Sequence, residues 1–194
     1  MKEIEKTIKR AKKIVITSHQ SPDGDAIGSS LALFHYLNKL DKQVTVIVPD
    51  AFPVFLNWME DADKILRYDT QEKIAHQTIA EADVIFSLDY NALNRIGALR
   101  TPIEQSNATK IVIDHHQDPK EFADHYMVDS ECCSTSQLIY ELIEKLNDLP
   151  KLDDTIGSCI YCGIMTDTGS FRYPSTSCIY QSGKVSLSPM VNIM

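Results

Sequence analysis

Four short runs of apolar, mostly β-branched residues are spaced along the chain. They read IVITS at 14–18, VTVIV at 44–48, VIFSL at 84–88 and IVID at 111–114. Within each run the apolar residues scarcely alternate with polar ones, which is typical of strands buried on both faces of a parallel sheet. The pattern therefore predicts a central parallel sheet of at least four strands.

Helical patterns lie around these runs. Residues 26–40 carry apolar side chains over much of a helix circumference, which predicts a well-buried helix. Residues 134–147 begin with Ser and Thr capping candidates, and residues 153–165 open on two aspartates. Ile4 and Ile8 fall at helical spacing near the start of the chain. Alternating strands and helices predict an α/β fold of three layers, with helices on both faces of the sheet.

Composition and charge narrow the functional classes. The chain has 194 residues and a formal net charge of −8, with no block of basic residues. These features argue against a binding surface for long duplex DNA, although a short anionic substrate remains compatible if metal ions supply positive charge locally. No apolar run is long enough to span a membrane, and the charged N-terminal segment lacks a secretory hydrophobic region. With five cysteines, an odd number, we expect reduced thiols and a cytoplasmic location.

Residues that commonly bind metal ions cluster where the predicted strands end. The stretch HQSPDGDAIGS at 19–29 follows the first strand, DYN follows the third, and DHH ends the fourth. Since the carboxyl ends of parallel strands meet at one edge, we expect these side chains to converge there. A further aspartate follows the helix predicted at 153–165. The candidates are His19, Asp23, Asp25, Asp89, Asp114, His115, His116 and Asp167.

The chemistry of this set favours two hard divalent cations. Carboxylates with a few imidazoles and no convincing thiolate suit Mn²⁺ or Mg²⁺ better than a structural zinc ion. More than three carboxylates exceed what one cation usually holds. Two ions that share a carboxylate would balance the charge, generate a bridging hydroxide and bind a phosphoryl group.

Each candidate also has a simpler interpretation. Asp25 alone could be a helix N-cap, and Asp89 alone a turn residue. Either histidine of the pair at 115–116 could be a hydrogen-bonded core residue. The cysteines at 159 and 162, and the pair at 132–133, are best explained as ordinary thiols. The coincidence of ligand-type groups at three strand ends favours a common site.

Four sequence blocks together resemble the DHH phosphoesterase superfamily, named for a triplet found here at 114–116. The blocks are HQSPDGDAIGSSLAL, SLDYNALNRIG, VIDHH and GIMTDTGSF, which span 19–171. Within the superfamily the chain is most similar to the nanoRNase and pAp-phosphatase branch, some members of which are called exopolyphosphatase-related. The resemblance implies hydrolysis of short oligoribonucleotides to 5′-mononucleotides and of 3′-phosphoadenosine 5′-phosphate to AMP. Alternatives are a cyclic-dinucleotide hydrolase or pyrophosphatase of the same superfamily, or a module that binds metal or nucleotide without turnover.

The resemblance also implies a role for each site residue. The implied metal ligands are His19 and Asp23 for one ion, Asp25, His115 and Asp167 for the other, and Asp89 for both, with Mn²⁺ the expected metal and Mg²⁺ an alternative. His116 would face the substrate phosphate and orient or protonate it. Asp114 would fix a histidine tautomer. Arg95 is implied either as a phosphate contact or as a structural contact.

The end of the chain departs from the family pattern. Residues 178–194 contain no acidic residue and show no clear periodicity, so we expect a metal-binding domain at 1–177 followed by an anomalous tail. Members of the family carry a second domain that grips the substrate. Without that domain we expect metal binding to survive and turnover to be impaired, since phosphoryl transfer depends on positioning. An uncovered apolar face would also allow a homodimer.

Overall fold

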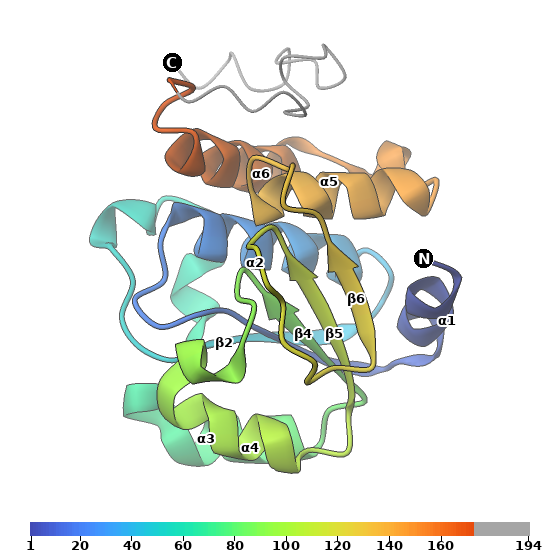
Figure 1. Cartoon of the computed structure of the whole chain (residues 1–194), viewed down its shortest axis with the longest axis vertical. Coiled ribbons are helices and arrows are strands. Elements are labelled where there is room, and N and C mark those ends of the chain that lie inside the picture. Colours follow the sequence, from blue (N-terminus) through green and yellow to red (C-terminus); the bar gives the residue numbers. More distant parts are fainter. Residues whose placement is uncertain (173–194) are drawn as a thin grey trace.

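The computed structural model describes residues 1–172 and shows a parallel sheet enclosed by helices (Figure 1). The strand order is β3-β2-β1-β4-β5-β6, and every neighbouring pair is parallel. This arrangement confirms the predicted α/β class. The strands are β1 (Lys13–Thr17), β2 (Gln43–Val48), β3 (Leu66–Arg67), β4 (Val84–Leu88), β5 (Thr109–Asp114) and β6 (His125–Val128).

The four apolar runs form the four central strands because these strands are buried on both faces. In β1, Ile14 and Ile16 belong to the larger apolar core, whereas Val15 between them belongs to a second, smaller core on the opposite face. Ile85 and Phe86 of β4 divide between the two cores in the same way. The uninterrupted apolar sequence therefore reflects two buried faces.

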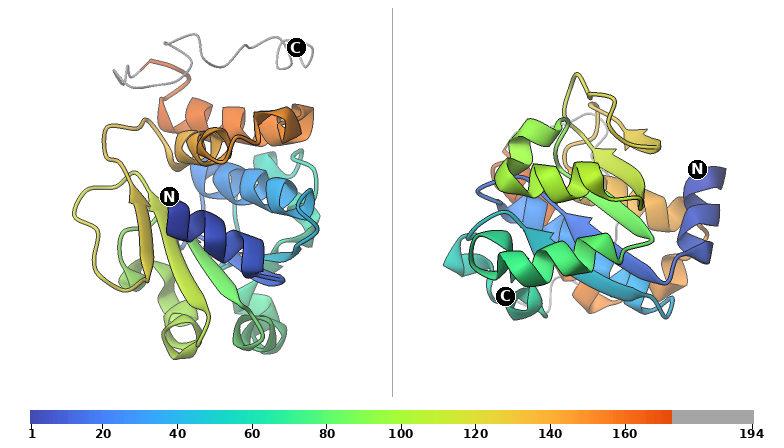
Figure 2. Two further views of the ribbon diagram at one scale, coloured as in Figure 1. Left: turned by 90° about the vertical axis from the view of Figure 1, so that its right-hand side faces the viewer. Right: turned by 90° about the horizontal axis from the view of Figure 1, so that it is seen from below.

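Helices cover both faces of the sheet (Figures 1 and 2). The helices α3 and α4 lie on one face, and α2 lies on the other with α5 beside it. The helix α6 packs on α2, on the side away from the sheet. The helices are α1 (Lys2–Arg10), α2 (Gly24–Asn38), α3 (Tyr68–Ala80), α4 (Arg100–Gln105), α5 (Thr135–Lys145) and α6 (Asp154–Asp167).

The start of α2 differs slightly from the prediction, and the difference decides the role of two aspartates. The helix begins at Gly24 because the Asp23 carboxylate caps it, accepting from the N–H groups of Asp25 and Ala26 at 3.0 Å each. The N-cap is therefore Asp23 and not Asp25, which leaves the Asp25 side chain available for other contacts.

Three further sequence-based expectations can be compared with residues 1–172. No helix in this part of the chain has both the length and the apolar character needed to cross a membrane. Cys132, Cys159 and Cys162 are buried free thiols, in agreement with their interpretation as ordinary cysteines. The anomalous tail at 178–194, and the boundary expected at 177, lie outside the described residues.

Candidate metal centre

The predicted ligands converge at the carboxyl edge of the sheet. His19 lies two residues beyond the end of β1, Asp89 follows β4, and Asp114 is the last residue of β5. Two helix ends complete the site: α2 begins there with Asp25 in its first turn, and α6 ends there. Asp167, expected just after a helix, is the last residue of α6.

One group of ligand atoms comes from His19, Asp23 and Asp89, which lie within 4.8 Å of one another. The Nε2 atom of His19 is 3.4 Å from Asp89 Oδ2 and 4.0 Å from Asp23 Oδ1. Asp89 is buried, whereas the Asp23 side chain is 56% exposed. This group therefore reaches from the interior to solvent.

A second group contains Asp25, His115 and Asp167, again within 4.8 Å. The Nε2 atom of His115 is 3.1 Å from Asp167 Oδ2 and 3.5 Å from Asp89 Oδ1. The two groups are thus adjacent and meet at Asp89. A third overlapping combination joins Asp89 to His115 and His116.

Asp89 occupies the centre of the site with its two carboxylate oxygens facing different histidines. Its Oδ2 faces His19 and its Oδ1 faces His115, at 3.4 and 3.5 Å respectively. Its backbone has a φ of +63°, in the left-handed region that aspartate tolerates better than most residues. Its N–H donates to the carbonyl of Ile113 at 3.1 Å, which ties this turn to β5.

The His19 ring is oriented to coordinate a cation through Nε2. Its Nδ1 is 2.7 Å from the carbonyl oxygen of Gln20. Because a carbonyl can only accept, Nδ1 carries a proton, and Nε2 is the atom directed towards Asp23 and Asp89, where it could coordinate a bound cation once deprotonated. The backbone N–H of Gln20 donates to the Arg95 carbonyl at 2.8 Å, so the loop carrying Arg95 braces this turn. The donors present fit a hard divalent cation.

His116 is held by a buried carboxylate. Its Nδ1 donates to Asp114 Oδ1 at 2.7 Å, and the side chain of Asp114 is fully buried. This bond fixes the proton on Nδ1 and leaves Nε2 as the atom available to a ligand. The side chain of His116 is 31% exposed. The predicted support of a histidine tautomer by Asp114 thus corresponds to a direct hydrogen bond.

The N-terminus of α5 makes contacts that the sequence did not predict. The N–H groups of Thr135 and Ser136 donate to the two oxygens of Asp25, at 2.6 and 2.9 Å. The Thr135 hydroxyl donates to Asp89 Oδ1 at 2.9 Å. The sequence signal was the Ser/Thr run that opens this helix, which suggested capping alone. In fact Ser134 is the cap, and the next two residues support the carboxylates.

A glycine allows α6 to approach α2 and α5 closely. A Cβ at Gly163 would lie 1.9 Å from Ser136 Oγ and 2.6 Å from Asp25 Oδ1. Any side chain there would therefore displace groups next to the second set of ligand atoms. The glycine brings the helix that carries Asp167 against the helix that carries Asp25.

Crowded carboxylates and imidazoles shift the pKa values in the site. Burial, with the negative charges of Asp89 and Asp167, raises the pKa of Asp25 well above its usual range. Burial alone would raise the pKa of Asp89, but the hydrogen bond from His19 and the charge of His115 outweigh it and lower that pKa. Burial opposes protonation of His115, yet its bond to Asp167 and the nearby carboxylates raise its pKa to about 9. The protein has concentrated negative charge that attracts cations.

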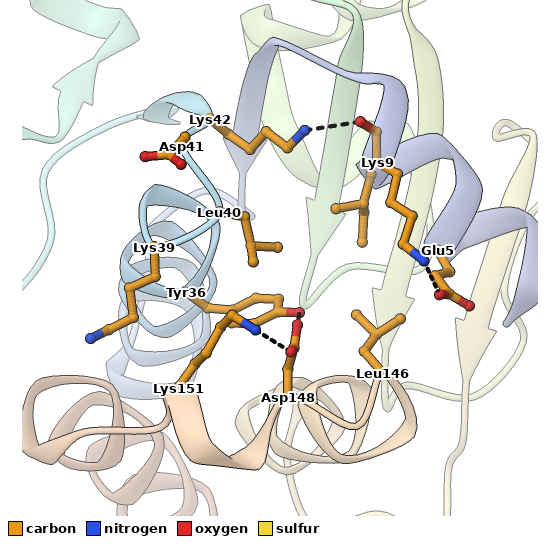
Figure 3. Close-up of a pocket in the computed structure, with 11 residues that line it drawn as sticks. Glu5, Lys9, Tyr36, Lys39, Leu40, Asp41, Lys42, Leu146, Asp148 and Lys151 are labelled. Carbon is orange, nitrogen blue, oxygen red and sulfur yellow. Dashed lines mark hydrogen bonds and ion pairs between the residues drawn. The ribbon is translucent and has the colours of Figure 1, made fainter.

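A cavity of about 500 Å³ lies away from this site and is lined by α1, the end of α2 and the segment after α5 (Figure 3). Its lysines already have partners: Lys9 pairs with Glu5, Lys151 with Asp148, and Lys42 with backbone carbonyls. Tyr36 donates to Asp148 at 2.7 Å. The cavity contains none of the predicted site residues.

Comparison with known proteins identified one matching family and several similar proteins. The family described as "DHH family, N-terminal domain" matches residues 13–164. The bifunctional oligoribonuclease and PAP phosphatase NrnA of Thermus thermophilus is 30% identical over 167 residues, which cover 84% of this chain and 46% of that protein. The cyclic-di-AMP phosphodiesterase PdeA of Listeria monocytogenes is 24% identical over 177 residues, covering 87% of this chain and 26% of that protein.

A solved structure shares both fold and sequence. The crystal structure of an exopolyphosphatase-related protein from Bacteroides fragilis superposes with a TM-score of 0.93 at 43% identity. The match covers 98% of this chain and 55% of that protein. The chain spans about half the length of the NrnA proteins it matches.

Proposed function

Because the chain belongs to the DHH family, we propose that it is a metal-dependent phosphoesterase acting on short oligoribonucleotides and on 3′-phosphoadenosine 5′-phosphate. The main observation that supports this proposal is the pair of adjacent ligand sets that meet at Asp89 on the carboxyl edge of the sheet. The names of the NrnA relatives support the choice of substrates. The products would be 5′-mononucleotides and AMP.

In this proposal the two ligand sets bind two divalent cations. His19 and Asp23 would hold one ion, Asp25, His115 and Asp167 would hold the other, and Asp89 would be shared between the two sets. Carboxylate and imidazole donors favour Mn²⁺, with Mg²⁺ as the alternative. When bound, the ions supply Lewis-acid charge for the phosphoryl oxygens and activate water as the nucleophile.

His116 and Asp114 supply the proton chemistry in this scheme. Asp114 accepts a hydrogen bond from His116 Nδ1, which leaves Nε2 as the atom that would face the substrate phosphate. When Nε2 is protonated as well, the imidazolium could donate a hydrogen bond to a phosphoryl oxygen or pass the Nε2 proton to the leaving oxygen, which returns the ring to its neutral form. Arg95, whose backbone braces the His19 turn, is proposed as a contact for a second phosphate.

The direct test is hydrolysis by the 194-residue chain with Mn²⁺. Separate reactions would contain 3′-phosphoadenosine 5′-phosphate, a five-nucleotide RNA, cyclic di-AMP and pyrophosphate, with product identity read by chromatography. The proposal predicts AMP from the first and 5′-mononucleotides from the second, formed more slowly than by a full-length NrnA relative assayed in parallel. Asp89→Ala should abolish both products. If the folded wild-type chain gives no product from any of the four substrates, that result would contradict an enzymatic role. It would favour a module that binds metal without turnover.

The second candidate is cyclic-dinucleotide hydrolysis. It is favoured by the similarity to PdeA, which covers 87% of this chain. Preferential cleavage of cyclic di-AMP in the same assay would select it. A linear dinucleotide product would separate it from the oligoribonuclease, which cleaves further to mononucleotides.

A further inference from the structure

Thr135 contacts both ligand sets through different atoms. Its backbone N–H donates to Asp25 Oδ2 at 2.6 Å, and its hydroxyl donates to Asp89 Oδ1 at 2.9 Å. The residue is fully buried, and so are the two carboxylates. A single residue at the start of α5 therefore touches one carboxylate of the second set and the carboxylate that both sets share.

We propose that Thr135 is a positioning residue whose hydroxyl fixes the rotation of the Asp89 carboxylate and thereby completes the second cation site. This inference rests on the proposed two-cation function. A carboxylate is free to rotate about its Cβ–Cγ bond unless its oxygens are held. The hydroxyl holds Oδ1 on the side of His115, which leaves Oδ2 facing His19.

The environment of Asp89 Oδ1 explains why this hydroxyl matters. The same oxygen is 3.5 Å from His115 Nε2 and 3.8 Å from His116 Nδ1. A bound cation would take over the electrostatic interaction that the two imidazole rings make with Oδ1. The uncharged Thr135 hydroxyl could still donate its hydrogen bond to this oxygen and keep it oriented. Groups that orient metal ligands in this way are typically worth about 10- to 100-fold in metal affinity.

The positioning role can be separated from helix capping. Ser134, the neighbouring residue, is the N-cap of α5, and its Oγ accepts from the Gln137 N–H at 3.1 Å. Loss of that cap should weaken the helix without removing a donor from Asp89. Ser134→Ala is therefore a matched control for general destabilisation of α5, whereas Thr135→Val removes the hydroxyl and keeps the backbone bond to Asp25.

The experiment is a titration of the full chain with Mn²⁺ alone, in which calorimetry and electron paramagnetic resonance measure the bound ions. Thermal melting of each variant measures its stability. Asp23→Ala and Asp167→Ala mark the loss of the first and second sites. Thr135→Val should weaken binding of the second cation by about 10- to 100-fold and match the pattern of Asp167→Ala. Thr135→Ser should restore it. Ser134→Ala should melt earlier yet retain the wild-type affinity for both ions.

The outcomes distinguish the inference from its premise. Two ions bound by the wild type, with unchanged affinities in Thr135→Val, would overturn the positioning role alone. No Mn²⁺ bound by the wild type would overturn the proposed function and the inference together. If Thr135→Val does not fold, Thr135→Ala tests the same hydroxyl without adding bulk. Equal losses in Ser134→Ala and Thr135→Val would assign the effect to the helix and overturn the proposal.

Discussion

The Asp89 carboxylate illustrates how one residue can serve two sets of ligands. It follows a central strand directly, its backbone lies in the left-handed region, and its side chain is buried. Each oxygen then meets a different histidine. Burial of a charge is costly unless it is compensated. In this structure the compensation comes from the imidazoles and from the α5 hydroxyl.

Hydrogen bonding separates the proposed role of His116 from metal binding. In His116→Asn the side-chain amide can still donate to Asp114, but the ring Nε2 is lost. We predict that both Mn²⁺ ions still bind and that turnover falls by about 10²- to 10⁴-fold. Calorimetry and product assays on the same preparation measure the two effects. Loss of one ion in this variant would instead make His116 a metal ligand.

Sequence reasoning located the residues of the candidate site better than their supports. The aspartates and histidines could be predicted to meet because a parallel sheet brings strand ends to one edge. The contacts of Thr135 with Asp25 and Asp89 depend on how α5 packs across the site, over a separation of 110 residues for Asp25. Local capping preferences carry no information about that packing.

Between elements, the approach of α6 to α2 depends on Gly163. Alanine normally stabilises a helix relative to glycine by about 0.5–1 kcal/mol. In Gly163→Ala the new Cβ would instead overlap Ser136 and Asp25. We predict a net destabilisation of about 1–3 kcal/mol, typical of overpacking, together with weaker Mn²⁺ binding. Urea unfolding measures the first effect, and Ser158→Ala in the same helix provides a control that lacks this overlap. Increased stability of Gly163→Ala would show that the helices are free to separate.

Asp83 lies at the opposite edge of the sheet, where β1 and β4 begin, and its carboxylate allows a test of how stability depends on pH. Asp83 Oδ2 accepts from the N–H groups of Lys12 and Lys13 at 2.7 and 2.8 Å, where β1 begins. These backbone bonds lower the pKa of Asp83 in the folded protein. Its contribution is therefore present above the ordinary value of about 3.9 and is lost as the pH falls through the folded pKa.

Asp83→Ala should accordingly unfold at lower urea concentration than the wild type at pH 7. The difference should shrink as both proteins are titrated into the acid range, since protonation removes the same interaction from the wild type. Urea midpoints at several pH values measure it. A difference that stays constant down to acid pH would assign the effect to packing rather than to the carboxylate.

Strands with long apolar runs were predictable, whereas the two at the sheet edges were not. β3 has two residues, and β6 reads HYMV with Tyr126 exposed. Edge strands are short and have fewer buried neighbours, so they lack the continuous apolar signal. α3 was missed for a related reason, since few of its residues are buried and its sequence is largely polar.

In the whole molecule, which has a net charge of −8, several carboxylates lie together at the carboxyl edge of the sheet. A ligand that binds only the folded state stabilises it, by about 2.7 kcal/mol for one site at 100 times the dissociation constant. We predict that Mn²⁺ raises the melting temperature and that a chelator reverses the change. Asp89→Ala should respond weakly to either addition. An equal rise in both proteins would indicate binding outside the site.

We propose that two cations occupy the two ligand sets that meet at Asp89. The most direct measurement is an anomalous diffraction map from crystals of the chain grown with Mn²⁺. We expect two peaks, one among His19, Asp23 and Asp89 and the other among Asp25, His115, Asp167 and Asp89. A single peak, or peaks away from Asp89, would contradict it.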